Sequence, residues 1–185
     1  MTCIVATRER GSITVGADSL GSSDYDCEVR RDPKVGCVGP YIFGYAGSFR
    51  VGQIILYDFE PPEPAYKTAD YLYPFMVTEF ISKLRDTLKD AGAMSIKNMA
   101  EEVDGGDIII GIHGQIFYIQ CDLQVGWPNQ PFAAIGCGAS YAIGAMYTAY
   151  KLKKRGTMLL YAGLEAAEAF SAGVRPPFIF ESNKK

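Results

Sequence analysis

The fold of this chain is decided near its beginning, at residues 2–18, TCIVATRERGSITVGAD. Residues 2–7 are mostly apolar and β-branched, which is typical of a strand. Residues 9–11 include a glycine and supply a turn. Residues 12–17 alternate between polar and apolar side chains, as a half-buried strand does. The stretch therefore predicts two strands joined by a turn, the second of which ends at Asp18.

Thr2 directly follows the initiator methionine. A small residue at this position permits the removal of Met1, and Thr2 would then carry a hydroxyl nucleophile and a primary amine base in one residue. Other activated hydroxyls need a separate general base, usually a histidine, and this chain has only one histidine. Thr2 is therefore a candidate nucleophile.

Length and composition are those of an ordinary globular protein. The 185 residues are enough for one substantial domain, which we expect to span residues 1–185. A net charge of −3 gives no general attraction to nucleic acid or to anionic membranes. No segment approaches the ~18 consecutive apolar residues of a membrane span, and no secretory signal is predicted. We therefore expect no nucleic-acid partner and no membrane partner.

The cysteines indicate the compartment. There are five, irregularly spaced, and no Cys-x-x-Cys pair occurs. Most lie in apolar runs, where free cysteine behaves as a small hydrophobic residue, so we expect reduced thiols in a cytoplasmic protein. The single histidine, His113, has no partner at metal-ligand spacing and is interpreted as a turn residue between two strands. The sequence predicts no metal and no cofactor.

The first half of the chain continues with a strand pair and two helices. Residues 34–38 and 41–46 have the composition of paired strands. Ser48 can cap a first helix, which the Pro-rich segment 60–64 ends. Apolar residues then recur at steps of three and four over residues 72–88, which predicts a second, strongly amphipathic helix.

The second half repeats the order of strands followed by helices. Residues 107–111 and 115–120 predict a hairpin, and a strand at 132–135 leads into a Gly-Cys-Gly turn. Two helices and a short final strand follow, at residues 139–150, 159–170 and 178–180. Hairpin-rich strands grouped apart from helices favour antiparallel sheets with helices on their outer faces. We therefore predict an α+β fold, a four-layer αββα sandwich.

At this point the chain resembles a known family, the proteasome β-subunits and HslV-type peptidases, which are N-terminal-nucleophile hydrolases. The matching motifs occur in the family's order and cover most of the chain. They are TCIV at 2–5, GADS at 16–19, KV at 34–35, GYAG at 44–47, the hairpin at 107–122 and AIGCG at 134–138.

The resemblance implies a catalytic set. Thr2 would be the nucleophile, with its own α-amine as the base, and an α-amine titrates near ~8, close to working pH. Lys34 would lie beside Thr2 and lower the pKa values of its amine and hydroxyl, with Asp18 as the counter-charge of the buried ammonium. The backbone N–H of Gly44 would help to form the oxyanion hole.

The resemblance also implies a substrate site. The strand and loop around Ser22 and around residues 42–46 would hold the substrate, and Ile42 and Ala46 would line an apolar first specificity pocket. Two departures from the family's pattern are visible. Cys137 stands where the family has a serine that contacts the catalytic amine. Residues 172–177, AGVRPP, contain no acid where the family has an aspartate.

The implied function is a threonine-type endopeptidase without cofactor. It would act on peptides or unfolded proteins inside a self-compartmentalising homo-oligomeric ring, of the kind often fed by an ATP-dependent unfoldase. Two alternatives stay open at this point. One is a non-catalytic or weakly active ring or scaffold subunit, which the two departures favour. The other is an amidase of the same superfamily that acts on a small molecule.

Overall fold

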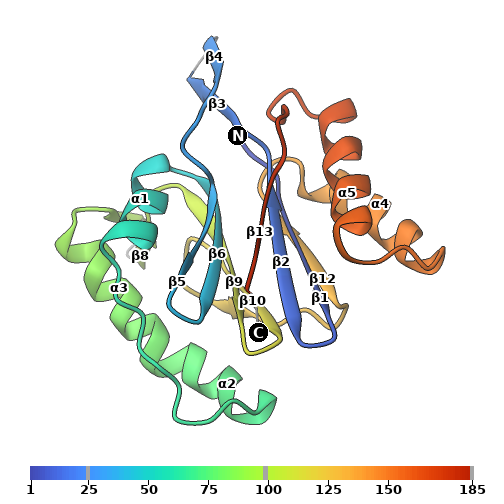
Figure 1. Cartoon of the computed structure of the whole chain (residues 1–185). Coiled ribbons are helices and arrows are strands. Elements are labelled where there is room, and N and C mark those ends of the chain that lie inside the picture. Colours follow the sequence, from blue (N-terminus) through green and yellow to red (C-terminus); the bar gives the residue numbers. More distant parts are fainter. Residues whose placement is uncertain (24–25, 98–99, 184–185) are drawn as a thin grey trace.

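The computed structural model describes residues 1–23, 26–97 and 100–183. Two antiparallel sheets pack face to face, and helices cover the outer face of each, as Figure 1 shows edge-on. The predicted four-layer αββα sandwich is confirmed.

The four-stranded sheet is built on the hairpin predicted at the start of the chain. Its strand order is β12-β1-β2-β13, and every neighbouring pair is antiparallel. Ile4 is paired with both Ala17 and Ile135, which places the first strand in the middle of the sheet. The strands are β1 (Ile4–Glu9), β2 (Ser12–Ala17), β12 (Phe132–Ile135) and β13 (Ile179–Ser182).

The five-stranded sheet has the order β11-β10-β9-β6-β5. His113 lies in the turn between β9 and β10 with a positive φ of 45°, so it is a turn residue as predicted. The strands are β5 (Val35–Val38), β6 (Tyr41–Gly47), β9 (Gly106–Ile112), β10 (Gln115–Ile119) and β11 (Val125–Gly126).

Helices cover the two outer faces. Ser48 caps the first helix by accepting a hydrogen bond from the Val51 amide, as predicted. The amphipathic helix predicted at 72–88 is confirmed, although it begins earlier and contains a π-helical segment, η1. The helices are α1 (Phe49–Tyr57), α2 (Ala69–Phe75), η1 (Met76–Phe80), α3 (Ile81–Asp90), α4 (Ala139–Lys151) and α5 (Gly156–Phe170).

Three apolar layers hold the sandwich together. One lies between the five-stranded sheet and the helices α1 to α3, where Phe43 and Phe80 stack at 6.4 Å. The second fills the space between the two sheets and includes Ile4, Val15 and Ile109. The third lies between the four-stranded sheet and α4 with α5. The helical and strand periodicities of the sequence follow from these three layers.

Two short hairpins escape prediction from the pattern. Their strands are only four residues long and bury only Leu20, Gly21 and Val103, so burial imposes little alternation on their sequences. The hairpin beside the N-terminus projects from the sandwich (Figure 1). The strands are β3 (Leu20–Ser23), β4 (Asp26–Val29), β7 (Met94–Lys97) and β8 (Ala100–Val103).

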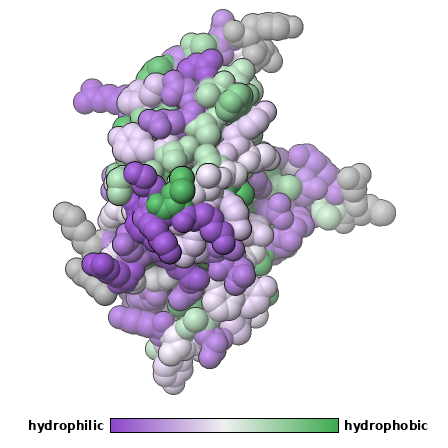
Figure 2. Space-filling model, turned by 90° about the vertical axis from the view of Figure 1, so that its right-hand side faces the viewer, coloured by the Kyte–Doolittle hydropathy of each residue, from purple (hydrophilic) through white to green (hydrophobic). Residues whose placement is uncertain are grey.

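The outer face of α4 and α5 is mixed in character. Phe170 and Leu152 are 72% and 70% exposed. In Figure 2, which faces this side, hydrophobic patches are interrupted by hydrophilic ones. No helix among the described residues has the length and apolar character needed to cross a membrane.

Candidate active site

The ends of three strands meet at one edge of the sandwich. Thr2 lies just before β1, Asp18 just after β2, and Lys34 just before β5. The first two come together because β1 and β2 form a hairpin. Lys34 joins them because β5 belongs to the facing sheet, whose residues share the inter-sheet layer with Ile4. All three are almost fully buried, with at most 2% of their surface exposed.

The ammonium of Lys34 is the centre of this cluster. It donates to Thr2 Oγ1 at 2.9 Å, to Asp18 Oδ1 at 3.0 Å and to the carbonyl of Leu20 at 2.7 Å. An ammonium has three donors, so all three are satisfied. Burial lowers the pKa of Lys34 below its ordinary value, and the Asp18 carboxylate opposes this shift by favouring the charged form.

The carboxylate of Asp18 is fixed by backbone amides from two segments. It accepts hydrogen bonds from the amides of Cys3 and Leu20 at 3.0 Å each, and a longer one from the Arg175 amide at 3.5 Å. These bonds anchor Asp18 to the start of β1 and to the segment that precedes β13. The Lys34–Asp18 pair is therefore held in one geometry.

Met1 precedes Thr2 in this structure, and the two residues differ in exposure. Met1 is 56% exposed, whereas Thr2 is 2% exposed. The Thr2 hydroxyl donates to the Met1 carbonyl, and the Thr2 amide donates to Cys137 Sγ at 3.3 Å. An amide nitrogen cannot accept a proton, so Thr2 gains its base only once Met1 is removed.

Cys137 connects Thr2 to a residue that the sequence does not single out. Its sulfur lies 3.5 Å from the Ser171 hydroxyl, which also accepts a hydrogen bond from the Gly173 amide at 3.3 Å. Ser171 is the residue just after α5, immediately before the stretch that lacks an acid. No motif marks it, because a serine at a helix end is also ordinary capping chemistry.

Gly44 lies apart from this cluster. It occupies the middle of β6, paired with Val35 on one side and Ile109 on the other. A Cβ added at Gly44 would lie 2.6 Å from Ile4 Cγ2 and 3.0 Å from Val15 Cγ1, inside the inter-sheet layer. The glycine allows the two sheets to approach each other, and this placement does not suit an oxyanion donor.

Gly47, at the end of the same strand, suits that role better. Strand amides point alternately to the two neighbouring strands. The Tyr45 amide donates to Lys34 O on the β5 side, whereas the Ser48 amide donates to Gly105 O on the other side. The Gly47 amide therefore points to the β5 side, beyond the first residue of β5, Val35. Its φ of 112° is a conformation that glycine adopts readily.

The predicted substrate residues are divided between interior and surface. Ile42 has no exposed surface and lies in the inter-sheet layer, so the placement expected for it at the substrate pocket is wrong. Ala46 lies at the edge of that layer, with its Cβ 3.0 Å from a Cβ added at Gly136. A Cβ at Gly136 would also lie 2.4 Å from the Thr2 carbonyl, so Ala46 and Thr2 are close neighbours.

Ser22 lies in β3 and lines a cavity of about 450 Å³. Arg30 and Phe49 line the same cavity, and the Arg30 guanidinium stacks on the Phe49 ring at 4.0 Å. Lys34 Nζ lies 5.7 Å from that ring. The cavity is therefore only one aromatic ring away from the Lys34 cluster. Within the described part of the chain, no three His, Cys, Asp or Glu side chains are placed to hold a metal ion.

Comparison with solved structures identifies the fold. The chain is similar to Thiobacillus denitrificans BPH, with 22% sequence identity over 98% of this chain and 97% of that chain, and a TM-score of 0.79. The same protein in complex with epoxomicin gives a TM-score of 0.78 at the same identity and coverage. HslV from Trypanosoma brucei is 14% identical over 98% of both chains, with a TM-score of 0.67.

The chain has the HslV-type fold. The resemblance drawn from the sequence motifs is thus confirmed at the level of the fold. No family model matches this sequence, and no curated protein matches it either. The HslV-type fold here carries its Thr, Asp and Lys at one edge of the sandwich, with Cys137 and Ser171 beside them.

Proposed function

We propose that this protein is a threonine-type endopeptidase whose nucleophile is Thr2 after removal of Met1. One observation carries the proposal, the buried ammonium of Lys34 at 2.9 Å from Thr2 Oγ1, fixed by Asp18. An ion pair with a purely structural role would not need the Thr2 hydroxyl as an acceptor for one of the three N–H groups of the Lys34 ammonium. The similarity of the fold to HslV-type structures supports the same reading.

Each step of acyl transfer has a group in place. The freed α-amine of Thr2 accepts the hydroxyl proton, and Lys34 stabilises the developing alkoxide through its positive charge. The alkoxide attacks a peptide carbonyl, and the open amide of Gly47 stabilises the oxyanion; such a donor is typically worth on the order of 100-fold or more. The protonated amine then gives its proton to the leaving amine, and water hydrolyses the acyl-enzyme.

Cys137 and Ser171 position the amine in this proposal. Cys137 Sγ lies 3.3 Å from the Thr2 nitrogen, and the Ser171 hydroxyl lies 3.5 Å from the same sulfur. A thiol is a weaker hydrogen-bonding group than a hydroxyl, so this support is weaker than a serine in the same place. We therefore expect Cys137→Ser to keep or raise the rate, and Ser171→Ala to lower it by less than Thr2→Ala does.

The proposed assembly is a homo-oligomeric ring that encloses the active sites. One subunit carries the complete Thr2, Asp18 and Lys34 set, so no second kind of subunit is needed. Peptides or unfolded proteins are the proposed substrates, and an ATP-dependent unfoldase is the proposed partner. Light scattering of the purified protein measures the assembly, and a monomer would favour a small-molecule amidase instead.

The decisive experiment is covalent labelling of Thr2. The intact mass of the purified protein first shows whether Met1 is absent. Epoxomicin, found in complex with the similar BPH, is then added to wild-type protein and to Thr2→Ala. We expect a mass increase of one inhibitor in the wild type, located at Thr2, and none in the variant.

A matched control isolates the role of the free amine. Insertion of a lysine between Met1 and Thr2 keeps the initiator in place and leaves Thr2 internal, so this protein should neither be labelled nor cleave fluorogenic peptides. Equal peptide cleavage by wild type and Thr2→Ala would remove Thr2 from the mechanism. Absence of both labelling and cleavage in a protein that has lost Met1 would favour the non-catalytic subunit.

A further inference from the structure

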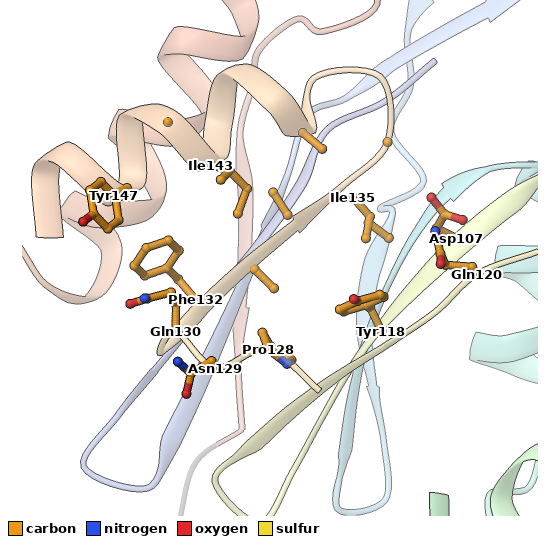
Figure 3. A pocket seen from close by; sticks show the side chains of 15 residues that line it. Asp107, Tyr118, Gln120, Pro128, Asn129, Gln130, Phe132, Ile135, Ile143 and Tyr147 are labelled. Atoms are coloured by element: carbon orange, nitrogen blue, oxygen red, sulfur yellow. The ribbon is translucent and has the colours of Figure 1, made fainter. Parts of the chain in front are cut away.

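A cavity of about 610 Å³ lies between the four-stranded sheet, α4 and the strands β9 and β10. Figure 3 shows its lining: Tyr147 and Phe132 at one end, Tyr118 and Ile135 in the middle, and Asp107 with Gln120 at the other end. The cavity is therefore long, apolar over most of its length and acidic at one end.

The acidic end of this cavity adjoins Thr2. Gly136 lines the cavity, and the next residue, Cys137, contacts the Thr2 nitrogen. Asp107 is the strand partner of Ala46, which lies beside Gly136. The cavity thus begins on the amine side of Thr2. The cavity lined by Ser22 and Phe49 is near Lys34, on the hydroxyl side.

The floor of the cavity is a free strand edge. β12 pairs with β1 and with no second strand among the described residues. The Arg8 amide donates to the Pro131 carbonyl, so the backbone N–H and C=O groups of Ala133 and Ile135, two and four residues later, also face β1. The backbone N–H and C=O groups of Phe132 and Ala134 then face away from β1, toward the cavity. An extended peptide can pair with such an edge.

Asp107 is a carboxylate without a counter-charge within the range that the structure covers, residues 1–23, 26–97 and 100–183. Burial raises its pKa, and the neighbouring Asp122 adds to the shift. A cation bound in the cavity would offset both the desolvation of Asp107 and its repulsion by Asp122. We therefore expect a basic side chain at the residue of a bound peptide that lies nearest to Thr2.

We propose that this cavity binds the leaving half of the peptide substrate, extended along β12, with a basic residue first and apolar residues after it. The proposal rests on the proposed peptidase function. The leaving amine must receive its proton from the α-amine of Thr2, so the leaving half has to lie on the amine side of Thr2. Gly136 and Asp107 begin the cavity on that side.

The test uses internally quenched peptides with one constant acyl half and three leaving halves, Lys-Leu-Leu, Glu-Leu-Leu and Gly-Gly-Gly. We expect kcat/KM for Lys-Leu-Leu to exceed that for Glu-Leu-Leu by roughly fivefold to tenfold, as a partly buried ion pair allows. Asp107→Asn should remove this preference, whereas Asp90→Asn, at an exposed acid of α3 that does not line the cavity, should keep it.

A second pair of variants tests the apolar part. Tyr147→Ala should lower kcat/KM for Lys-Leu-Leu roughly tenfold through lost apolar contact, and leave Gly-Gly-Gly unchanged. Tyr141→Ala is the matched control, because Tyr141 has similar exposure on the same helix but does not line the cavity. A peptide-aminocoumarin amide, which has no leaving peptide, should be cleaved equally by all four variants.

The outcomes separate this inference from the peptidase proposal. Cleavage of the aminocoumarin amide, with no difference among the three leaving halves, overturns the inference and leaves the peptidase intact. A Tyr147→Ala loss that is equally large for the aminocoumarin amide, which has no leaving peptide, also overturns it. If wild type cleaves nothing, fluorescence anisotropy of labelled Lys-Leu-Leu on Thr2→Ala protein decides. If the peptide binds, and the additional substitution Tyr147→Ala weakens this binding, the result supports the proposed role of the cavity. If the peptide does not bind, the proposal is overturned.

Discussion

The coupling between Lys34 and Asp18 gives the sharpest test of the site's energetics. Lys34→Met replaces the ammonium by an apolar chain of similar length, and Asp18→Asn replaces the carboxylate by its neutral isostere. The two side chains are 1% and 0% exposed and lie 3.0 Å apart. At an effective dielectric constant of about 20, that separation corresponds to an attraction of roughly 5 kcal/mol, which offsets a desolvation cost of several kcal/mol per ion.

Each single variant leaves one buried charge without its partner, so we expect each to lower the free energy of unfolding by about 3–5 kcal/mol. The loss of stability in Lys34→Met should fall at the lower end of this range, because the Asp18 carboxylate still accepts hydrogen bonds from the amides of Cys3 and Leu20. The double variant has no unpaired charge and should lose less than the two single losses added together. We expect a coupling energy of at least about 2 kcal/mol.

The measurement is urea-induced unfolding at pH 7, followed by circular dichroism at one fixed protomer concentration, because assembly would otherwise change the apparent stability. Losses that add to within about 0.5 kcal/mol would show that the pair is not coupled, and would refute the account of this site. Both single variants should also lose peptide cleavage, because Lys34→Met removes the positive charge beside the Thr2 hydroxyl and Asp18→Asn removes the carboxylate that favours the charged form of Lys34.

Three further predictions concern the rest of the chain. Burial raises the pKa of Cys3 to about 12, so iodoacetamide at pH 8 should leave Cys3 unmodified while it alkylates the exposed cysteines, as peptide mass spectrometry would show. Gly44→Ala should cost about 1–3 kcal/mol of stability by overpacking against Ile4, whereas Gly144→Ala, in open space on a helix, should gain about 0.4–1 kcal/mol. Burial raises the pKa of Asp107 in the folded state above the ordinary value of 3.8, so the free energy of unfolding falls as the pH rises from 3.8 through the raised pKa. Asp107→Asn should therefore be more stabilising at pH 7 than at pH 3, as denaturant titrations at the two pH values would show.

The sequence by itself determined the layers of this protein and predicted the main residues of its candidate site. Local alternation over residues 2–18 and helical periodicity over residues 72–88 arise from burial on one face, and burial leaves a mark on any sequence long enough to show a period. Thr2, Asp18 and Lys34 could be named because each stands at a strand end within a recognisable motif. The strands of the two short hairpins are too short for burial to produce a recognisable period in their sequences.

Only the tertiary structure decided which groups beside Thr2 are free to act. Gly44 and Gly47 belong to one motif, yet the amide of the first faces a paired strand and that of the second faces beyond the start of β5. Ser171 meets Cys137 across 34 residues. The direction of an amide and the closeness of two distant side chains depend on which strands pair and where they end. Those are properties of the assembled sheets, which a local pattern of residues does not contain.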